Sequence, residues 1–158
     1  MDTSSFADKD GYIWLNGKLV PWRDANIHVL THGLHYASSV FEGERVYDGE
    51  IFKLREHTDR LIESARILGF KLEQTAEEIN EASRQTVLAN KIVDGYVRPV
   101  AWRGSEMMGV SAQNNRINLA IAAWVWPSYF SPEARMKGIR LKLSEWKRPS
   151  PETIPTKS

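Results

Sequence analysis

The sequence predicts an α+β fold, because hairpin signals dominate its first third and helix signals follow before further strands begin. The dipeptides Asn16-Gly17 and Asp48-Gly49 each stand between short runs of strand-forming residues and suit the positive φ angles of a type I′ turn. Thr75, followed three residues later by Glu78, has the pattern of a capping box that opens a helix.

The individual elements follow from these turns and from the spacing of apolar residues. Two helices are indicated, one over 56–68 that ends before Gly69 and one that starts at Thr75. The run that reaches Trp126 is nearly all apolar at its end, which is typical of a central strand. The predicted strands cover residues 12–15, 18–20, 40–47, 50–54, 96–102 and 116–126.

The predicted strand over 40–47 has an unusual charge pattern. Alternate residues of a strand face opposite sides, which puts Glu42 and Glu44 on one face and Arg45 on the other. A strand that only packs against a core would carry apolar residues along one face. We therefore expect a functional site or an interface beside this strand.

We interpret residues 1–129 as a small N-terminal domain, because the composition after it shifts to proline and to small or polar residues. Residues 130–137 include Pro132 and are interpreted as an interdomain linker. Residues 138–158 begin with an alternating pattern over 139–143 that predicts another strand. One strand and a loop cannot bury themselves as a domain, so this strand either joins the first sheet or opens a second, truncated domain.

Composition excludes several classes of function. Twenty-one Lys and Arg against 20 Asp and Glu give a net charge of +1. This balance does not favour binding to nucleic acid or to anionic lipid. The absence of cysteine rules out disulfides and thiolate metal sites. The polar N-terminus and the short apolar runs predict a soluble, cytoplasmic protein without a membrane segment.

Three histidines, His28, His32 and His35, lie close together in the sequence. Their spacing of four and three residues would suit metal ligands on a helix. However, Gly33 interrupts a helix here and no carboxylate lies within the run. We therefore expect hydrogen-bonded structural histidines and no metal site.

Several positions are candidates for ligand binding on spacing alone. Tyr96 and Arg98 point to the same face of their strand, so a phenol and a guanidinium would meet a ligand together. Arg98 in an apolar setting needs an anionic partner, which is either a ligand carboxylate or an internal acidic residue. Trp126 stands at the end of its strand and would wall a pocket, whereas the spacing of Arg60 indicates a solvated helical arginine.

Six segments, in order along nearly the whole chain, resemble the class IV, or fold-type-IV, pyridoxal-phosphate aminotransferases, and specifically the branched-chain amino-acid aminotransferases. The resemblance implies the small two-layer α/β domain of that fold type, followed by the first strand of a larger C-terminal cofactor domain. Each segment is weak alone, but six in register are specific. They are Tyr12-Ile-Trp-Leu-Asn-Gly, His32-Gly-Leu-His-Tyr, Ser39-Val-Phe-Glu-Gly-Glu-Arg, Arg55-Glu-His-Thr-Asp-Arg-Leu, Tyr96-Val-Arg-Pro and Thr153-Ile-Pro-Thr.

The resemblance implies roles for residues by their position. Arg60 matches the arginine that holds the cofactor phosphate, in place of a merely solvated role. Tyr96 and Arg98 match the strand pair that helps to seat substrate carboxylates. Gly109 and Val110 match a loop that reaches into the neighbouring subunit's pocket, which implies a homodimer or a higher homo-oligomer. The residues that match the substrate side-chain pocket are Tyr36, Phe41, Gly43, Trp126 and Tyr129.

The implied activity is transamination of the branched-chain L-amino acids Val, Leu and Ile with 2-oxoglutarate, through a Schiff base of pyridoxal 5′-phosphate. The family's Schiff-base lysine follows the segment Thr-Ile-Pro-Thr by three residues. It is therefore expected just after Ser158, one or two places beyond Lys157. No catalytic residue is expected within the chain, which we interpret as a fragment that is inactive by itself. The expected partners are small amino-acid and 2-oxo-acid substrates.

Two other interpretations stay open. Class IV also includes D-amino-acid transaminases, amine transaminases and aminodeoxychorismate lyases, which share the scaffold. From a different class, the chain could be a self-sufficient small α+β binding domain. That interpretation predicts that the last twenty residues pack onto the first sheet and that no cofactor binds.

Overall fold

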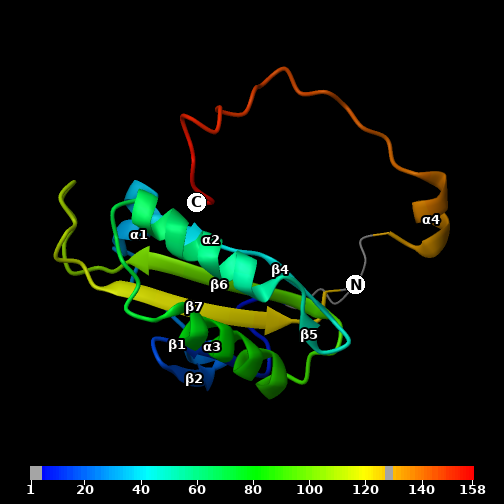
Figure 1. The fold of residues 1–158 in the computed structure, drawn as a ribbon, viewed down its shortest axis with the longest axis horizontal. Helices are drawn as coiled ribbons and strands as arrows, with labels where there is room; N and C mark the ends of the chain where they lie inside the picture. The colour runs from blue at the N-terminus through cyan, green and yellow to red at the C-terminus, as the bar shows by residue number, and fades with distance from the viewer. Residues whose placement is uncertain (1–4, 127–129) are drawn as a thin grey trace.

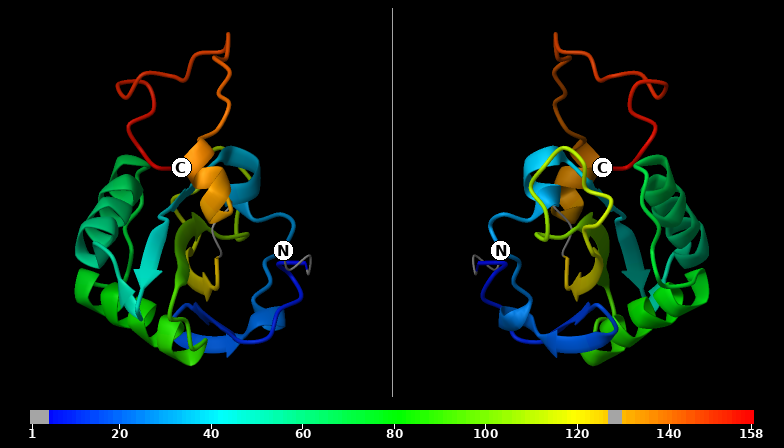
Figure 2. Two further views of the ribbon diagram at one scale, coloured as in Figure 1. Left: turned by 90° about the vertical axis from the view of Figure 1, so that its right-hand side faces the viewer. Right: turned by 90° about the vertical axis from the view of Figure 1, so that its left-hand side faces the viewer.

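The structure, a computed structural model, describes residues 5–126 and 130–158. These residues form one antiparallel sheet with two helices on one of its faces, which confirms the predicted α+β fold (Figures 1 and 2). The strands are β1 (Tyr12–Leu15), β2 (Lys18–Pro21), β3 (Ser39–Phe41), β4 (Glu44–Tyr47), β5 (Glu50–Ile51), β6 (Gly95–Arg103) and β7 (Ile117–Trp124). The helices are α1 (His32–Tyr36), α2 (Leu54–Ile67), α3 (Ala76–Ala89) and α4 (Pro132–Lys137), with a 3₁₀ turn, η1, over Trp22–Asp24.

The sheet runs in the order β2-β1-β7-β6-β4-β5, and β3 also pairs with β6. The longest pairing joins β6 to β7, from Tyr96 opposite Trp124 to Arg103 opposite Ile117. Both strands have neighbours on each side, which confirms that the apolar segment ending near Trp126 is central in the sheet. Candidate residues on β6 therefore lie in the most rigidly paired part of the described fold.

The core lies between the sheet and helices α2 and α3. Leu61 and Ile79 from the helices are fully buried, as are Val97 and Ile121 from the central strands. The predicted capping box opens α3, because Thr75 Oγ1 accepts the Glu78 backbone N–H and the Glu78 carboxylate accepts the Thr75 N–H. None of the helices in the described part of the chain is both long and apolar enough to cross a membrane.

The predicted strand over 40–47 is interrupted, since β3 and β4 flank a two-residue gap. Phe41 pairs with Val100 on β6, and β4 continues the same register after the gap. Opposite the gap stands Pro99, whose carbonyl accepts the Glu42 N–H at 2.9 Å. Proline has no N–H to return that bond, so the ladder is broken although the two chains stay in step.

The predicted strand over 50–54 was too long. Strand β5 covers only Glu50–Ile51, and helix α2 already begins at Leu54. Lys53 adopts a left-handed conformation with a φ of 57° just before the helix, and this turns the chain from the sheet into α2. Short-range apolar alternation does not predict a turn of this kind.

The last part of the chain differs from its prediction in two ways. Helix α4 occupies most of the predicted linker over 130–137, and its N-cap Ser131 accepts the Ala134 N–H. The strand predicted over 139–143 is absent, because no other strand in the described residues pairs with it and a strand cannot satisfy its backbone alone. The division into a domain, a linker and a second domain stays a prediction.

The segment after α4 loops away from the sheet and returns beside α2 and β3 (Figure 1). Leu141, Leu143 and Trp146 are almost completely exposed along this loop. Only its end touches the first sheet, where the Phe41 N–H donates to the carbonyl of Lys157 at 3.0 Å. The binding-domain interpretation, which requires the last twenty residues to pack onto the sheet, is therefore not favoured.

Candidate functional site

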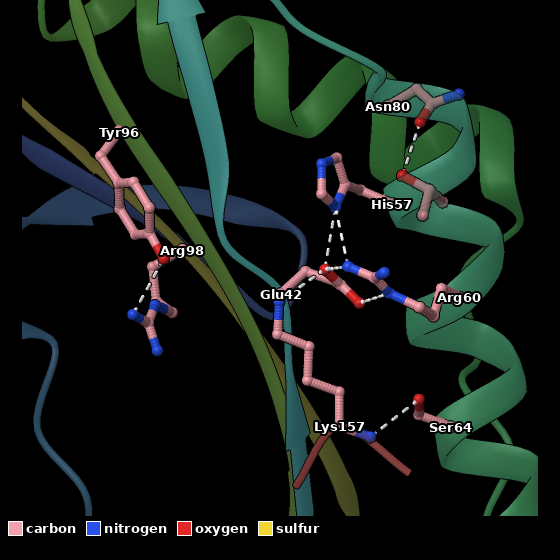
Figure 3. A network of polar contacts seen from close by, with 9 residues as sticks. Glu42, His57, Arg60, Ser64, Asn80, Tyr96, Arg98 and Lys157 are labelled. Carbon is pink, nitrogen blue, oxygen red and sulfur yellow. Dashed lines mark hydrogen bonds and ion pairs between the residues drawn. The ribbon is translucent and has the colours of Figure 1, made fainter. Parts of the chain in front are cut away.

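Residues 40–47 separate two groups of side chains, one on each face of the sheet. Figure 3 shows Glu42 directed toward helix α2, whereas Tyr96 and Arg98 lie on the other side of the strands. The alternation predicted from the sequence is present across the gap, because Val40, Glu42, Glu44 and Val46 are all buried on the helix side. The contacts of Glu42 place a group of polar side chains beside this strand, while the expected functional site or interface stays a prediction.

The Glu42 carboxylate has no exposed surface and is surrounded by cationic and histidine groups. Arg60 binds it with two hydrogen bonds, from Nε to Oε1 at 2.5 Å and from Nη2 to Oε2 at 2.6 Å. Lys157 Nζ lies 3.1 Å from Oε2 and His57 Nδ1 lies 2.9 Å from the same atom. A carboxylate only accepts hydrogen bonds, so this contact requires a hydrogen on His57 Nδ1, which then does not accept from Arg60 Nη2, 3.3 Å away.

These contacts decide the charge on Glu42. Burial alone would raise the pKa of its carboxyl, but hydrogen bonds from Arg60, His57 and Lys157 outweigh burial and lower the pKa to about 2. The same contact with Glu42 raises the pKa of Arg60. The pair is therefore ionised on both sides, and the buried negative charge is compensated where it stands.

Glu44 is the opposite case two residues further along the same face. Its carboxyl is 1% exposed, and neither oxygen has a hydrogen-bond partner among the described residues. Burial, aided by the negative charge of Glu42 and opposed by Lys157, raises the pKa of Glu44 to about 8. Burial thus favours the neutral form of Glu44, next to an ionised Glu42.

The other face carries an arginine between aromatic rings. The guanidinium carbon of Arg98 lies 4.5 Å from the centre of the Phe41 ring and 5.3 Å from that of Tyr96, which are cation–π distances. Arg98 Nη2 donates to the Tyr96 hydroxyl at 3.0 Å. Arg98 Nε is buried and has no hydrogen-bond partner among the described residues. Such a donor fits an anionic ligand.

Gly43 makes room for this arrangement. A Cβ atom at this position would stand 1.8 Å from the Tyr96 hydroxyl oxygen, far inside van der Waals contact. Only a glycine therefore lets the Tyr96 hydroxyl lie against the strand and meet Arg98. The aromatic surface continues beyond Tyr96, whose ring centre is 4.9 Å from that of Trp126 and 5.2 Å from that of Trp124.

A third group lies at the end of α1 and in the loop before β7. The Tyr36 hydroxyl donates to the carbonyl of Met108 at 3.0 Å, and its ring stacks on His32. His32 Nε2 lies 3.1 Å from the carbonyl of Gly109. Val110 is 87% exposed at the tip of this loop.

Comparison with known proteins assigns the fold to a family. The model of the family described as amino-transferase class IV matches residues 39–157, which is most of the chain and includes every contact of Glu42 described above. The chain belongs to the class IV aminotransferases.

Class IV relatives similar to this chain carry one activity in their names. The branched-chain-amino-acid aminotransferase of Pseudomonas aeruginosa is 47% identical over 148 residues, which cover 91% of this chain and 48% of that protein. The Escherichia coli K12 enzyme of the same name is 42% identical over 153 residues, covering 94% of this chain and 50% of the enzyme. The chain spans about half the length of the curated relatives it matches.

Solved class IV structures agree with this fold. The T.th. branched-chain amino acid aminotransferase with pyridoxamine 5′-phosphate superimposes with a TM-score of 0.87 at 40% identity, over 94% of this chain and 51% of that one. The enzyme of the archaeon Thermoproteus uzoniensis with norvaline gives a TM-score of 0.85 at 33% identity, over 95% and 52% of the two chains.

The structure places the predicted site residues in separate groups, and their roles stay predictions. The structure brings Phe41, Gly43, Tyr96, Arg98 and Trp126 together on one face of the sheet, and Tyr36 and Gly109 together with the exposed Val110 at the end of α1. Arg60 stands on the opposite face, beside the end of the chain. Tyr129 lies outside the described residues.

Sequence reasoning missed Glu42, which is the centre of the helix-side group, together with His57 and Trp124. The available signal was the pair of glutamates on the apolar face of the 40–47 strand, which indicated a site but not its partners. His28, His32 and His35 are hydrogen-bonded to nearby backbone or to Ser38, as expected of structural histidines. The described residues hold no cluster of three potential metal ligands.

Glu44 provides a pH test of this buried pair. Its carboxyl has a pKa of about 8 in the fold against an ordinary value of 4.5, so the folded state binds more protons between these values and stability falls as pH rises through them. We expect the intact protein to lose stability relative to its Glu44→Gln variant between about pH 5 and 8, by at most ~1.4 kcal/mol per pH unit. Urea unfolding of both proteins at several pH values measures this difference, and a difference that stays constant would show that Glu44 is ionised in the fold.

Proposed function

We propose that the intact protein transfers amino groups between branched-chain L-amino acids and 2-oxoglutarate, with pyridoxal 5′-phosphate as cofactor. The observation that carries this proposal is the surface of Phe41, Tyr96 and Trp126 with the Arg98 guanidinium set into it. One site of this kind suits both an apolar branched side chain and a carboxylate, as such a transaminase requires. The names of the class IV relatives support the same substrates.

The apolar part of this surface would receive Val, Leu or Ile. Burying such a side chain against the rings of Phe41 and Trp126 contributes roughly 1.5–3 kcal/mol. Gly43 lets the Tyr96 hydroxyl lie against the strand beside these rings.

The charged part of the surface would receive the distal carboxylate of glutamate or 2-oxoglutarate. Arg98 offers a buried Nε–H without a partner in the described structure, next to a second donor group that already contacts Tyr96. A carboxylate accepts from both nitrogens of one guanidinium edge and would satisfy the orphan donor. Class IV neighbours crystallised with N-(5′-phosphopyridoxyl)-L-glutamate and with 4-methylvaleric acid support a site for both kinds of ligand.

The helix-side group fits the cofactor phosphate. Arg60 is 54% exposed while Glu42 holds the edge formed by Nε and Nη2, so Nη1 on the opposite side of the guanidinium would meet an anion from solvent. When bound, the cofactor supplies the electron sink for amino-group transfer. Arg60 and the neighbouring end of the chain would bind and orient its phosphate, in keeping with the class IV neighbour that contains pyridoxamine 5′-phosphate.

The apolar surface around α1 supports a homodimer or a larger homo-oligomer. A cavity of about 320 Å³ beside Arg98 is lined mainly by apolar residues of β1, β6 and β7. Val29, Leu34 and Val110 are largely exposed near its rim or on the adjacent loop. Large exposed apolar patches commonly mark interfaces, so we propose that the loop with Gly109 and Val110 serves the site of a neighbouring subunit. We also propose a cytoplasmic location.

Replacing Arg60 tests its contact with the phosphate. We expect Arg60→Ala to weaken binding of pyridoxal 5′-phosphate by about tenfold or more, because a charge-assisted contact is lost, while the far-UV circular dichroism spectrum stays unchanged. Arg55→Ala is the matched control, since Arg55 lies on the same helix and pairs with Asp59 and Glu77 instead. Equal cofactor affinity in the wild type and Arg60→Ala would remove Arg60 from the cofactor site.

Replacing Arg98 tests the dual character of the substrate site. We expect Arg98→Ala to lower kcat/KM for 2-oxoglutarate by about tenfold to a hundredfold, since hydrogen bonds to charged groups contribute roughly 1.5–3 kcal/mol. The value for leucine should fall much less, and this second substrate serves as the internal control. Equal losses for both substrates would mean that Arg98 is purely structural.

A further inference from the structure

Glu42 is buried where no charge would normally be placed. Its side chain has no exposed surface, and it lies between β3 and β4 on the face that packs against α2. Transfer of a carboxylate into such a setting is unfavourable unless charged donors compensate it. A buried apolar residue would satisfy the packing of this face as well as a glutamate does. The carboxylate therefore needs an explanation beyond stability.

Its contact with Arg60 fixes the direction of a guanidinium that is otherwise half in solvent. The two hydrogen bonds at 2.5 and 2.6 Å engage the edge formed by Nε and Nη2. A planar guanidinium held along that edge cannot rotate, and it keeps the rest of its N–H groups in one orientation. Preorganisation of this kind lowers the entropy lost when an anion binds.

The same carboxylate also contacts the end of the chain. Lys157 Nζ lies 3.1 Å from Glu42 Oε2, and the Lys157 backbone is held beside it. Its carbonyl accepts the Phe41 N–H at 3.0 Å and its N–H lies 3.4 Å from Ser64 Oγ, one turn after Arg60 on α2 (Figure 3). One buried side chain thus sets the position of both the arginine and the terminal segment.

We propose that Glu42 is a positioning residue for the cofactor phosphate. It would hold Arg60 and the segment around Lys157 in fixed positions relative to each other. Glu42 touches neither substrate nor cofactor and acts through Arg60. This role rests on the proposed function, because it assumes that Arg60 receives the phosphate. A positioning role predicts that loss of Glu42 weakens only the binding of the cofactor's phosphate, whereas a structural role would weaken binding of the whole cofactor.

The test compares Glu42→Gln with Glu44→Gln in the intact protein. Both substitutions replace a buried glutamate on the same face with an amide of the same size, but Glu44 has no hydrogen bond to Arg60. Dissociation constants are measured by fluorescence for pyridoxal 5′-phosphate and for pyridoxal, which lacks the phosphate. Glu42→Gln should weaken pyridoxal phosphate binding by about tenfold and leave pyridoxal binding unchanged, since a bidentate charged pair becomes a single neutral contact. Glu44→Gln should change neither.

Other outcomes overturn the proposal. Equal weakening of both ligands by Glu42→Gln would indicate a merely structural residue, and unchanged binding of pyridoxal phosphate would indicate no role. If Glu42→Gln does not fold, Lys157→Met decides, because it removes one partner of Glu42 and should still weaken pyridoxal phosphate alone, by about threefold. A wild type that binds pyridoxal as tightly as pyridoxal phosphate would instead refute the phosphate site itself, and with it this part of the proposed function.

Discussion

The buried negative charge of Glu42 draws helix α2 and the segment around Lys157 to the same strand segment. Glu42 can stay ionised without solvent only because Arg60, His57 and Lys157 converge on it. These partners come from α2 and from the end of the chain, so the charge requirement joins segments that the sequence separates by more than a hundred residues. The proposed cofactor site depends on the exposed side of Arg60, because a cation held by Glu42 faces solvent there.

The alternation of a single extended segment keeps two chemistries apart. Glu42 faces the helices and Arg60, whereas Phe41 and Gly43 face the aromatic surface that holds Arg98. Both β3 and β4 pair with β6, and Pro99 on β6 interrupts this pairing at the gap between them without shifting the register. The alternation of side chains therefore continues across the gap. A one-residue slip would exchange the two faces and would destroy both groups together.

Local chemistry explains which features the sequence could predict. The turns at Asn16-Gly17 and Asp48-Gly49 and the cap at Thr75 depend on neighbouring residues, and the structure contains all three. The break in the 40–47 strand depends on Pro99 across the sheet, and the missing strand over 139–143 depends on a pairing partner. The Glu42 contacts depend on residues 15 to 115 positions away. Charge alternation indicated a site, while the resemblance to class IV enzymes, not spacing, pointed to Arg60.

A crystal structure of the intact protein with pyridoxal 5′-phosphate tests the account most directly. The account predicts phosphate oxygens within hydrogen-bond distance of Arg60 while Arg60 Nε and Nη2 remain bound to the Glu42 carboxylate. It also predicts that the Lys157 carbonyl still accepts the Phe41 N–H. A phosphate bound elsewhere, or an Arg60 that leaves Glu42 to reach it, would contradict the account.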